Sequence, residues 1–235
     1  VYADLFGNPS GPTVKPRPVQ SAPAASAVEK HFNKGLQLMR QGKPKEAHVE
    51  FQAAKKLRPN EPAILVNLGL CHLQMKNLSG AETAFKAVIA LDPKCKTPPA
   101  KFAIARLVGV LSAQGKHSEA IAMGKKYVSV APKEYDAHFS LGVCYLGAKN
   151  YTAAASSFKS ALAIKPNDPA ATQNLGVALL SSKDYPAARK FLEQTLARNV
   201  EIVDALGDDT LSRHETQLGE TTVSIGLAKI EEGSR

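Results

Sequence analysis

The three cysteines are the residues whose chemistry is easiest to test by spacing. Cys71, Cys95 and Cys144 are an odd and sparse set without a C-x-x-C pair, unlike the even framework of a disulfide-stapled domain. Cys71 and Cys144 fall two helical units apart in the organisation described below, which is too far for a disulfide or a shared metal. We therefore interpret them as small core residues and expect no metal site.

The histidines and glycines form no catalytic pattern either. His31 and His138 take one equivalent position of the repeat described below and His72 another, and we expect all three to pack in the core. Residues 109–117 come nearest to a phosphate-binding loop, but the glycine spacing is wrong and His117 stands where a magnesium-binding Ser or Thr is needed. The sequence predicts no catalysis and no cofactor.

The elements that would have to position any site are repeated along the chain. Pro59, Pro93, Pro132 and Pro166 are separated by 34, 39 and 34 residues, and the longer interval contains an insertion near 96–100. Aligned on these prolines, repeat positions 8 and 20 are small and position 24 is mostly a ring, a pattern typical of two closely packed helices. The residues are Gly35, Gly69, Val108, Gly142 and Gly176 at position 8, Ala47, Ala81, Ala120, Ala154 and Ala188 at position 20, and Phe51, Phe85, Gly124, Phe158 and Leu192 at position 24.

This pattern resembles five consecutive tetratricopeptide repeats. The resemblance implies an all-α fold, a right-handed superhelix of helix-turn-helix units over 28–61, 62–95, 101–134, 135–168 and 169–202. Apolar spacing predicts helices at 62–75, 78–91, 101–114, 117–130, 135–148, 151–164, 169–182 and 185–198. His31, Lys34 and Thr172 replace large apolar residues in the end repeats and Val200 replaces a closing proline, as solvent-facing ends require.

Two segments without the repeat flank these units. Residues 1–27 are rich in proline and predict an extended arm, whose apolar Val1, Tyr2, Leu5 and Phe6 we expect to dock on the same chain or on a neighbouring copy. Residues 203–235 form an acidic tail, in which Val223, Ile225 and Leu227 alternate with small residues as in a strand. Strand and helix both remain open for this tail.

The resemblance also predicts a ligand-binding groove, because positions 2, 5, 9 and 12 of the first helices line the concave surface in this family. The groove is apolar and is bordered by two polar residues, Asn67 and Arg106, which match a clamp for chaperone C-terminal carboxylates. Phe32, Leu36 and Phe102 replace the rest of that clamp, so we expect an amphipathic or extended peptide with apolar anchors instead. Burial of the groove by tight curvature and filling by the arm are the alternatives. The predicted lining is Phe32, Leu36, Met39, Val66, Asn67, Leu70, Leu73, Phe102, Ala105, Arg106, Phe139, Val143, Leu146, Val177 and Leu180.

The positive charge is unevenly distributed. The formal net charge is +9 with a pI near 9.4, but 28–202 carry +12 and the tail carries −4. One lysine recurs at each turn between paired helices, and this basic rim either offsets helix-end carbonyls or contacts an acidic partner such as another copy's tail. RNA binding is the alternative class, although the groove lacks aromatic rings interleaved with basic residues. The rim consists of Lys43, Lys76, Lys116, Lys149 and Lys183.

Composition also bears on whether the chain can span a membrane and on the compartment in which it works. The longest uncharged helical stretch, 62–75, is too short and too polar to span a bilayer. The arm and the missing initiator Met favour export to the periplasm or cell surface, whereas the unpaired cysteines favour the cytoplasm. Glycosylation sequons at Asn77 and Asn150 matter only for an exported protein. The sequence thus predicts a non-catalytic scaffold for a protein or peptide partner, with head-to-tail self-assembly through arm and tail.

Overall fold

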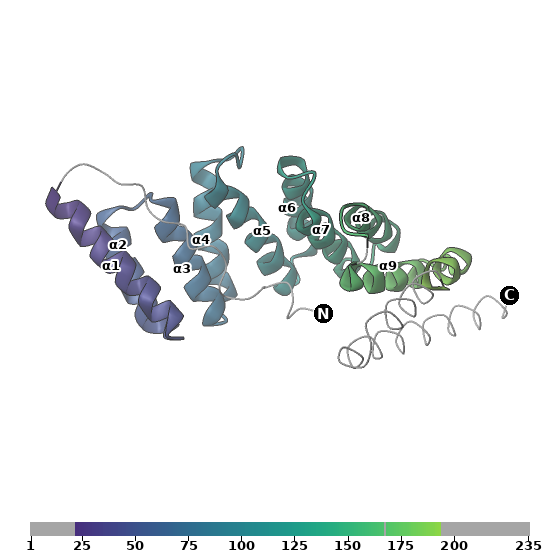
Figure 1. Cartoon of the computed structure of the whole chain (residues 1–235), viewed down its shortest axis with the longest axis horizontal. Coiled ribbons are helices and arrows are strands. Elements are labelled where there is room, and N and C mark those ends of the chain that lie inside the picture. Colours follow the sequence, from purple (N-terminus) through teal and green to yellow (C-terminus); the bar gives the residue numbers. More distant parts are fainter. Residues whose placement is uncertain (1–21, 167, 194–235) are drawn as a thin grey trace, which may run out of the picture. The chain divides into compact units, whose positions relative to one another are not determined.

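The computed structural model describes residues 22–166 and 168–193, and this part of the chain is helical throughout (Figure 1). It divides after Pro132 into two compact units. The first contains α1 (Ala22–Arg40), α2 (Pro44–Leu57), α3 (Pro62–Gln74), α4 (Leu78–Leu91), α5 (Pro98–Ala113) and α6 (His117–Val130). The second contains α7 (Tyr135–Gly147), α8 (Tyr151–Ile164), α9 (Pro169–Ser181) and the helical residues 185–193.

Prolines mark both ends of the helix pairs. α2, α3, α5 and α9 each have a proline in the first turn, where the missing N–H would have no helical partner in any case. The four spaced prolines that defined the repeat each stand two residues beyond the end of α2, α4, α6 or α8. The proline spacing therefore sets where each unit closes.

The turn inside each helix pair is held by a residue in the left-handed region. In the first and third repeats this residue is a glycine, Gly42 and Gly115 respectively. In the other three repeats it is a lysine, with φ of 57° at Lys76, 58° at Lys149 and 63° at Lys183. Each such lysine is followed by a capping residue, Asn77, Asn150 or Asp184, whose side-chain oxygen accepts a backbone N–H of the next helix. The two glycines are followed instead by Lys43 and Lys116, which provide no side-chain cap.

The predicted close approach within each pair is confirmed. A Cβ added to Gly69 would lie 2.6 Å from the Phe85 ring, so the ring occupies the space that only a glycine leaves. The third repeat reverses the sizes, with Val108 and Gly124 both buried. The same close approach joins Gly35 to Phe51, Gly142 to Phe158 and Gly176 to Leu192.

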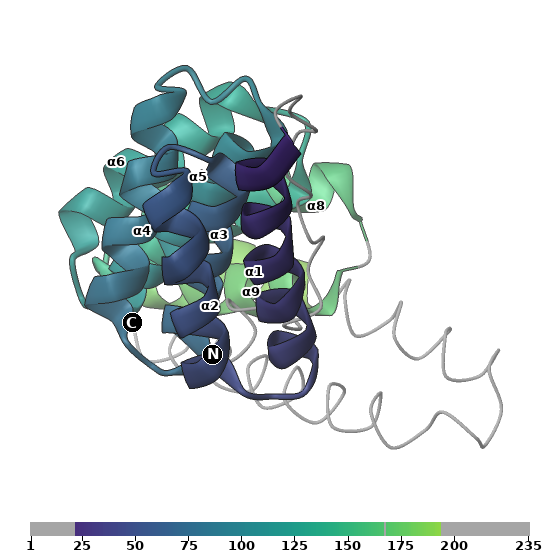
Figure 2. The same ribbon diagram turned by 90° about the vertical axis from the view of Figure 1, so that its left-hand side faces the viewer.

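One apolar core spans the first two repeats. Phe32 of α1 meets Phe51 of α2 edge to face at 5.6 Å between ring centroids, and Figure 2 shows these two helices side by side. Ile64 and Cys71 of α3 extend the same buried cluster into the second repeat. Burial of these side chains, rather than local propensity, holds consecutive repeats together.

Two predicted boundaries were wrong. α1 begins at Ala22, so residues 22–27 of the predicted arm are helical, because Pro23 is tolerated in a first turn and alanines that favour helix follow it. α5 begins at Pro98, inside the predicted insertion, because a proline pair can open a helix. The arm residues Val1, Tyr2, Leu5 and Phe6 and the tail 203–235, with its predicted strand, lie outside the described residues.

Candidate protein-interaction surface

The accessible part of the predicted groove in the first unit consists of four apolar side chains on α1 and α3. Leu36 and Met39 take repeat positions 9 and 12 of α1, Leu70 and Leu73 take the same positions of α3, and all four are half-buried. The Cys71 thiol donates to Met39 Sδ at 3.3 Å, which shows that the two helices touch here. We call these four residues the first-helix face.

The groove prediction was wrong for four residues, because the structure buries them. Phe32 and Val66 have no exposed surface, and Val143 is 5% exposed. Asn67 is 2% exposed, and its amide donates to the Ala63 carbonyl one turn earlier at 2.8 Å. Position 5 side chains such as Phe32 and Val66 turn into the contact between neighbouring helices, where a ligand cannot reach them.

The third repeat continues the accessible surface with an aromatic and a basic residue. Phe102 and Arg106 of α5 are half-buried, and the guanidinium carbon lies 4.9 Å from the ring centroid. This is a cation–π contact within one helix turn. Of the two polar residues predicted to border the groove, Asn67 is buried and hydrogen-bonded within its own helix, and Arg106 is accessible.

In the second unit the predicted groove residues belong to two different environments. Phe139 stacks on Tyr135 at 5.4 Å and meets Phe158 edge to face at 5.6 Å, so it is part of an aromatic cluster. Val177 of α9 is 45% exposed, and Leu146 of α7 and Leu180 of α9 are half-buried. Positions 9 and 12 are therefore the accessible ones on α9, as on α1 and α3.

The aromatic cluster is closed by polar groups at the start of α9. The Tyr135 hydroxyl donates to Asp168, which also caps α9 by accepting the Ala171 N–H at 2.9 Å. Lys165 Nζ lies 4.4 Å from the Tyr135 ring centroid. Burial, and then the hydrogen bond to Asp168, raise the pKa of Tyr135, so this hydroxyl is a structural donor.

The predicted basic rim is not one equivalent series. All five of its lysines are exposed, but Lys116 Nζ lies 2.7 Å from a carboxylate oxygen of Glu82 in α4, and Lys86 holds the other oxygen at 2.6 Å. Hydrogen bonds from Lys116 and Lys86 lower the pKa of Glu82 to about 2. Lys116 thus joins the second repeat to the third.

Glu50 plays the matching role in the first repeat, where His31 was predicted to lie in the core. His31 Nδ1 lies 2.7 Å from one oxygen of Glu50 and Lys34 Nζ lies 2.6 Å from the other, and the His31 side chain is 39% exposed. The lysine, and then the histidine, lower the pKa of Glu50. The core prediction for His31 was wrong, because a polar partner on α2 holds it at the surface.

Two histidines meet at the junction of the first and second repeats. His48 of α2 and His72 of α3 are in edge-to-face contact at 4.7 Å between ring centroids, and both are half-buried. Burial, and then the nearby His48, lower the pKa of His72. This arrangement favours the neutral form of His72.

Within 22–166 and 168–193, no three His, Cys, Asp or Glu side chains gather as metal ligands would. Cys71, Cys95 and Cys144 are buried and reduced, and Gly109 lies inside α5 rather than in a loop. No helix in this part of the chain is long and apolar enough to cross a bilayer.

Comparison with known proteins identifies the architecture. Sequence models described as tetratricopeptide repeat match residues 38–107 and 145–206 in one version and 109–169 in another. No curated protein matches the chain in sequence.

Solved structures that are similar in fold include the following three. MamA from Desulfovibrio magneticus RS-1, residue 41 to the end, is 20% identical with a TM-score of 0.68 and covers 77% of this chain and 98% of its own. PilF from Pseudomonas aeruginosa is 17% identical with a TM-score of 0.60 over 88% of this chain and 90% of its own. TTC0263, a thermophilic tetratricopeptide-repeat protein of Thermus thermophilus, is 20% identical with a TM-score of 0.54, and the match covers 83% of this chain and 99% of its own.

Proposed function

The chain belongs to the tetratricopeptide repeat family and is a protein-interaction scaffold, and from this premise we propose that its first-helix face binds an apolar polypeptide segment. Members of this family are generally non-catalytic. The binding surface comprises Leu36, Met39, Leu70 and Leu73 in the first unit. Phe102 and Arg106 of α5 extend it toward the third repeat.

The single observation that carries this proposal is the partial exposure of apolar side chains at positions 9 and 12. Polar residues are expected at solvent-facing helix positions, yet α1 and α3 place leucine or methionine at both positions. An apolar segment laid across two adjacent helices would remove these side chains from water, and each fully buried leucine contributes about 1.5 to 3 kcal/mol. An anchor of this kind is typical of helix-groove and extended-peptide recognition.

The proposed occupant is the N-terminal segment of the chain itself. Residues 1–7 place Val1, Tyr2, Leu5 and Phe6 within six positions and are followed by the proline-rich residues 8–21. Proline-rich linkers reach about 3 Å per residue when they are extended. The segment can therefore be supplied by the same copy or by a neighbour, and a neighbour's segment would produce a head-to-tail assembly.

A polypeptide fits the surface better than RNA. Single-stranded RNA is bound by aromatic rings that stack on bases beside basic residues. No Phe or Tyr in the described part of the chain is largely exposed, and the Phe102 ring already faces Arg106. The accessible apolar side chains are aliphatic, which suits peptide anchors.

Deletion of residues 1–7 tests the proposal. If a neighbour supplies the segment, light scattering will show a fall in mass; if the same chain supplies it, the mass stays constant and binding of an apolar dye rises. The added substitution Leu70→Ser should reduce the dye signal of the deletion variant, because it removes part of the uncovered surface. Unchanged mass together with unchanged dye binding would contradict the proposal.

A further inference from the structure

Leucines are exposed where the second helices of the first unit end. Leu57, the last residue of α2, is 48% exposed, and Leu91, the last residue of α4, is 41% exposed. They occupy the same repeat position, and Val130 at the end of α6 is half-buried there. These side chains lie at the ends of the second helices, whereas the first-helix face lies on the first helices α1 and α3.

Basic residues surround these exposed leucines. Lys55, Lys56 and Arg58 flank Leu57, Lys94 and Lys96 follow Leu91, and Lys125 and Lys126 precede Val130. None of these seven has an ion-pair partner among the described residues. We call this set, with Leu57 and Leu91, the basic edge.

Asp92 in the α4–α5 loop is one of two carboxylates at this edge, and seven basic residues outnumber them. The Asp92 carboxylate accepts the backbone N–H of Thr97 at 2.8 Å and its hydroxyl at 2.9 Å, and the bond to the Thr97 backbone is the main reason that the pKa of Asp92 is lowered. Asp92 thus holds the loop in shape, while Lys94 and Lys96 remain exposed. Glu61 adds one further carboxylate at the start of α3.

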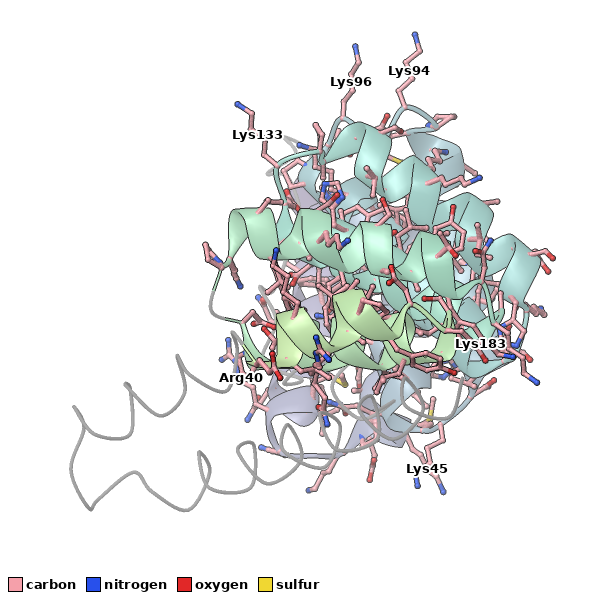
Figure 3. All side chains as sticks on the ribbon, turned by 90° about the vertical axis from the view of Figure 1, so that its right-hand side faces the viewer. Arg40, Lys45, Lys94, Lys96, Lys133 and Lys183 are labelled. Atoms are coloured by element: carbon pink, nitrogen blue, oxygen red, sulfur yellow. The ribbon has the colours of Figure 1, made fainter. Side chains whose placement is uncertain are left out.

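The basic residues of this edge come from three consecutive repeats, at the ends of α2, α4 and α6. Burial raises the pKa of the Cys95 thiol in this loop, and the charge of Lys126 on α6 opposes that shift. Figure 3 shows Lys94 and Lys96 projecting from the end of the repeats opposite to Arg40 and Lys45. The two ends of the first unit can therefore be tested separately.

A segment of the chain outside the described residues has the complementary chemistry. Residues 201–209 read Glu-Ile-Val-Asp-Ala-Leu-Gly-Asp-Asp, and no lysine or arginine occurs between 199 and 212. Four carboxylates alternate with the apolar Ile202, Val203 and Leu206. Acidic charge with apolar anchors matches a surface of lysines around two exposed leucines.

We propose that residues 201–209 of one copy bind the basic edge of a second copy. Charge complementarity directs the encounter and the apolar residues hold the contact, so the association weakens as salt screens the charges. This contact is independent of the first-helix face, and it persists when residues 1–7 are deleted.

Charge reversal on the full chain tests the proposal by sedimentation velocity. The edge variant carries Lys56→Glu, Lys94→Glu and Lys96→Glu, and the tail variant carries Asp204→Lys, Asp208→Lys and Asp209→Lys. The control variant makes the same number of reversals at the opposite end, with Arg40→Glu, Lys43→Glu and Lys45→Glu. Circular dichroism checks that each variant is folded.

The native chain should self-associate at low salt and dissociate in 0.5 M NaCl, and the edge and tail variants should each bind themselves about tenfold or more weakly. An equimolar mixture of those two variants should associate again, because each restores the other's missing charge. The control variant should associate as the native chain does. A monomeric native chain at low salt, an equal loss in the control, or no recovery in the mixture would overturn the proposal.

A labelled peptide of residues 199–212 provides a measurement that needs no change in the edge. The tail variant keeps the native edge and lacks the competing acidic segment, so it should bind the peptide in a salt-dependent way. Absence of peptide binding to the folded tail variant would also overturn the proposal.

Discussion

Lys116 Nζ lies 2.7 Å from the Glu82 carboxylate, and the two residues are 34 positions apart in the chain, in consecutive repeats. Glu82 is 9% exposed and is also held by Lys86, which reaches Glu119 at 3.4 Å. A nearly buried carboxylate is stable in its charged form only while its partners remain. This network therefore fixes the third repeat on the second.

Glu82→Gln should lower the free energy of unfolding by about 1 to 3 kcal/mol near neutral pH, because it leaves Lys86 and Lys116 without their shared acceptor. The pKa of Glu82 is about 2 in the folded chain, below its usual value of 4.5. Its contribution is therefore complete above about pH 5 and is lost as the pH falls toward 2. Denaturant titrations at several pH values should show the difference between native and variant shrinking with acid; a constant difference would contradict this account.

His72→Gln should reduce the loss of stability between pH 7.5 and 5.5. Because burial lowers the pKa of His72, the unfolded chain takes up its proton at a higher pH than the folded chain, and stability falls as the pH drops through the usual range near 6.5. The contact with His48 adds repulsion once both rings are charged. Thermal unfolding at the two pH values measures how much stability each protein loses. An equal loss in the native chain and the variant would contradict this role of His72.

Gly69→Ala should destabilise the chain by about 1 to 3 kcal/mol, since the new Cβ would lie 2.6 Å from the Phe85 ring. Phe85→Leu in the same chain should recover part of that loss, because at the equivalent Gly176 an added Cβ would meet only one leucine atom closely, Leu192 Cδ2 at 2.7 Å, at the flexible end of that side chain. A double-mutant cycle measures the coupling. Strictly additive effects would show that the ring and the glycine do not determine one another.

Lys76→Gly should leave stability unchanged or raise it by up to about 1 kcal/mol, because Lys76 has a φ of 57° that glycine adopts without strain. Gly115→Ala, at the equivalent turn position, should lower stability by a similar amount. Thermal unfolding distinguishes the two. A large loss from Lys76→Gly would mean that the lysine side chain has a structural role beyond its backbone conformation.

The repeat organisation could be predicted because it depends on short-range pattern. Proline spacing and the glycine–phenylalanine pairs, such as Gly69 with Phe85, located the helix pairs to within a few residues. The start of α1 at Ala22 could not be predicted from proline content, because one proline in a first turn does not prevent a helix. Whether a proline permits a helix depends on its position within the first turn, and the proline content of a segment does not give that position.

The candidate surface was only partly predictable. Phe32 and Leu36 are both apolar and one turn apart, yet Phe32 is buried and Leu36 is accessible. The difference depends on how α1 is rotated against its neighbours, which the sequence of a single helix does not fix. The ion pair of Glu82 with Lys116 was missed, although opposite charges one repeat apart were the signal that could have found it.

The most direct test of the central claim is binding of a labelled peptide, residues 1–10, to the chain lacking residues 1–7, followed by fluorescence anisotropy. Leu70→Ser should weaken binding about threefold to tenfold, because Leu70 is already half-buried and binding adds only part of the roughly 1.5 to 3 kcal/mol that full burial of a leucine contributes. Val49→Ser is the matched control, since Val49 is 65% exposed and belongs to the second helix α2, whereas the first-helix face is on α1 and α3. Binding that is weakened by Leu70→Ser and kept with Val49→Ser is the predicted result. Absence of binding, or equal weakening by both substitutions, would contradict the claim that the first-helix face binds this segment.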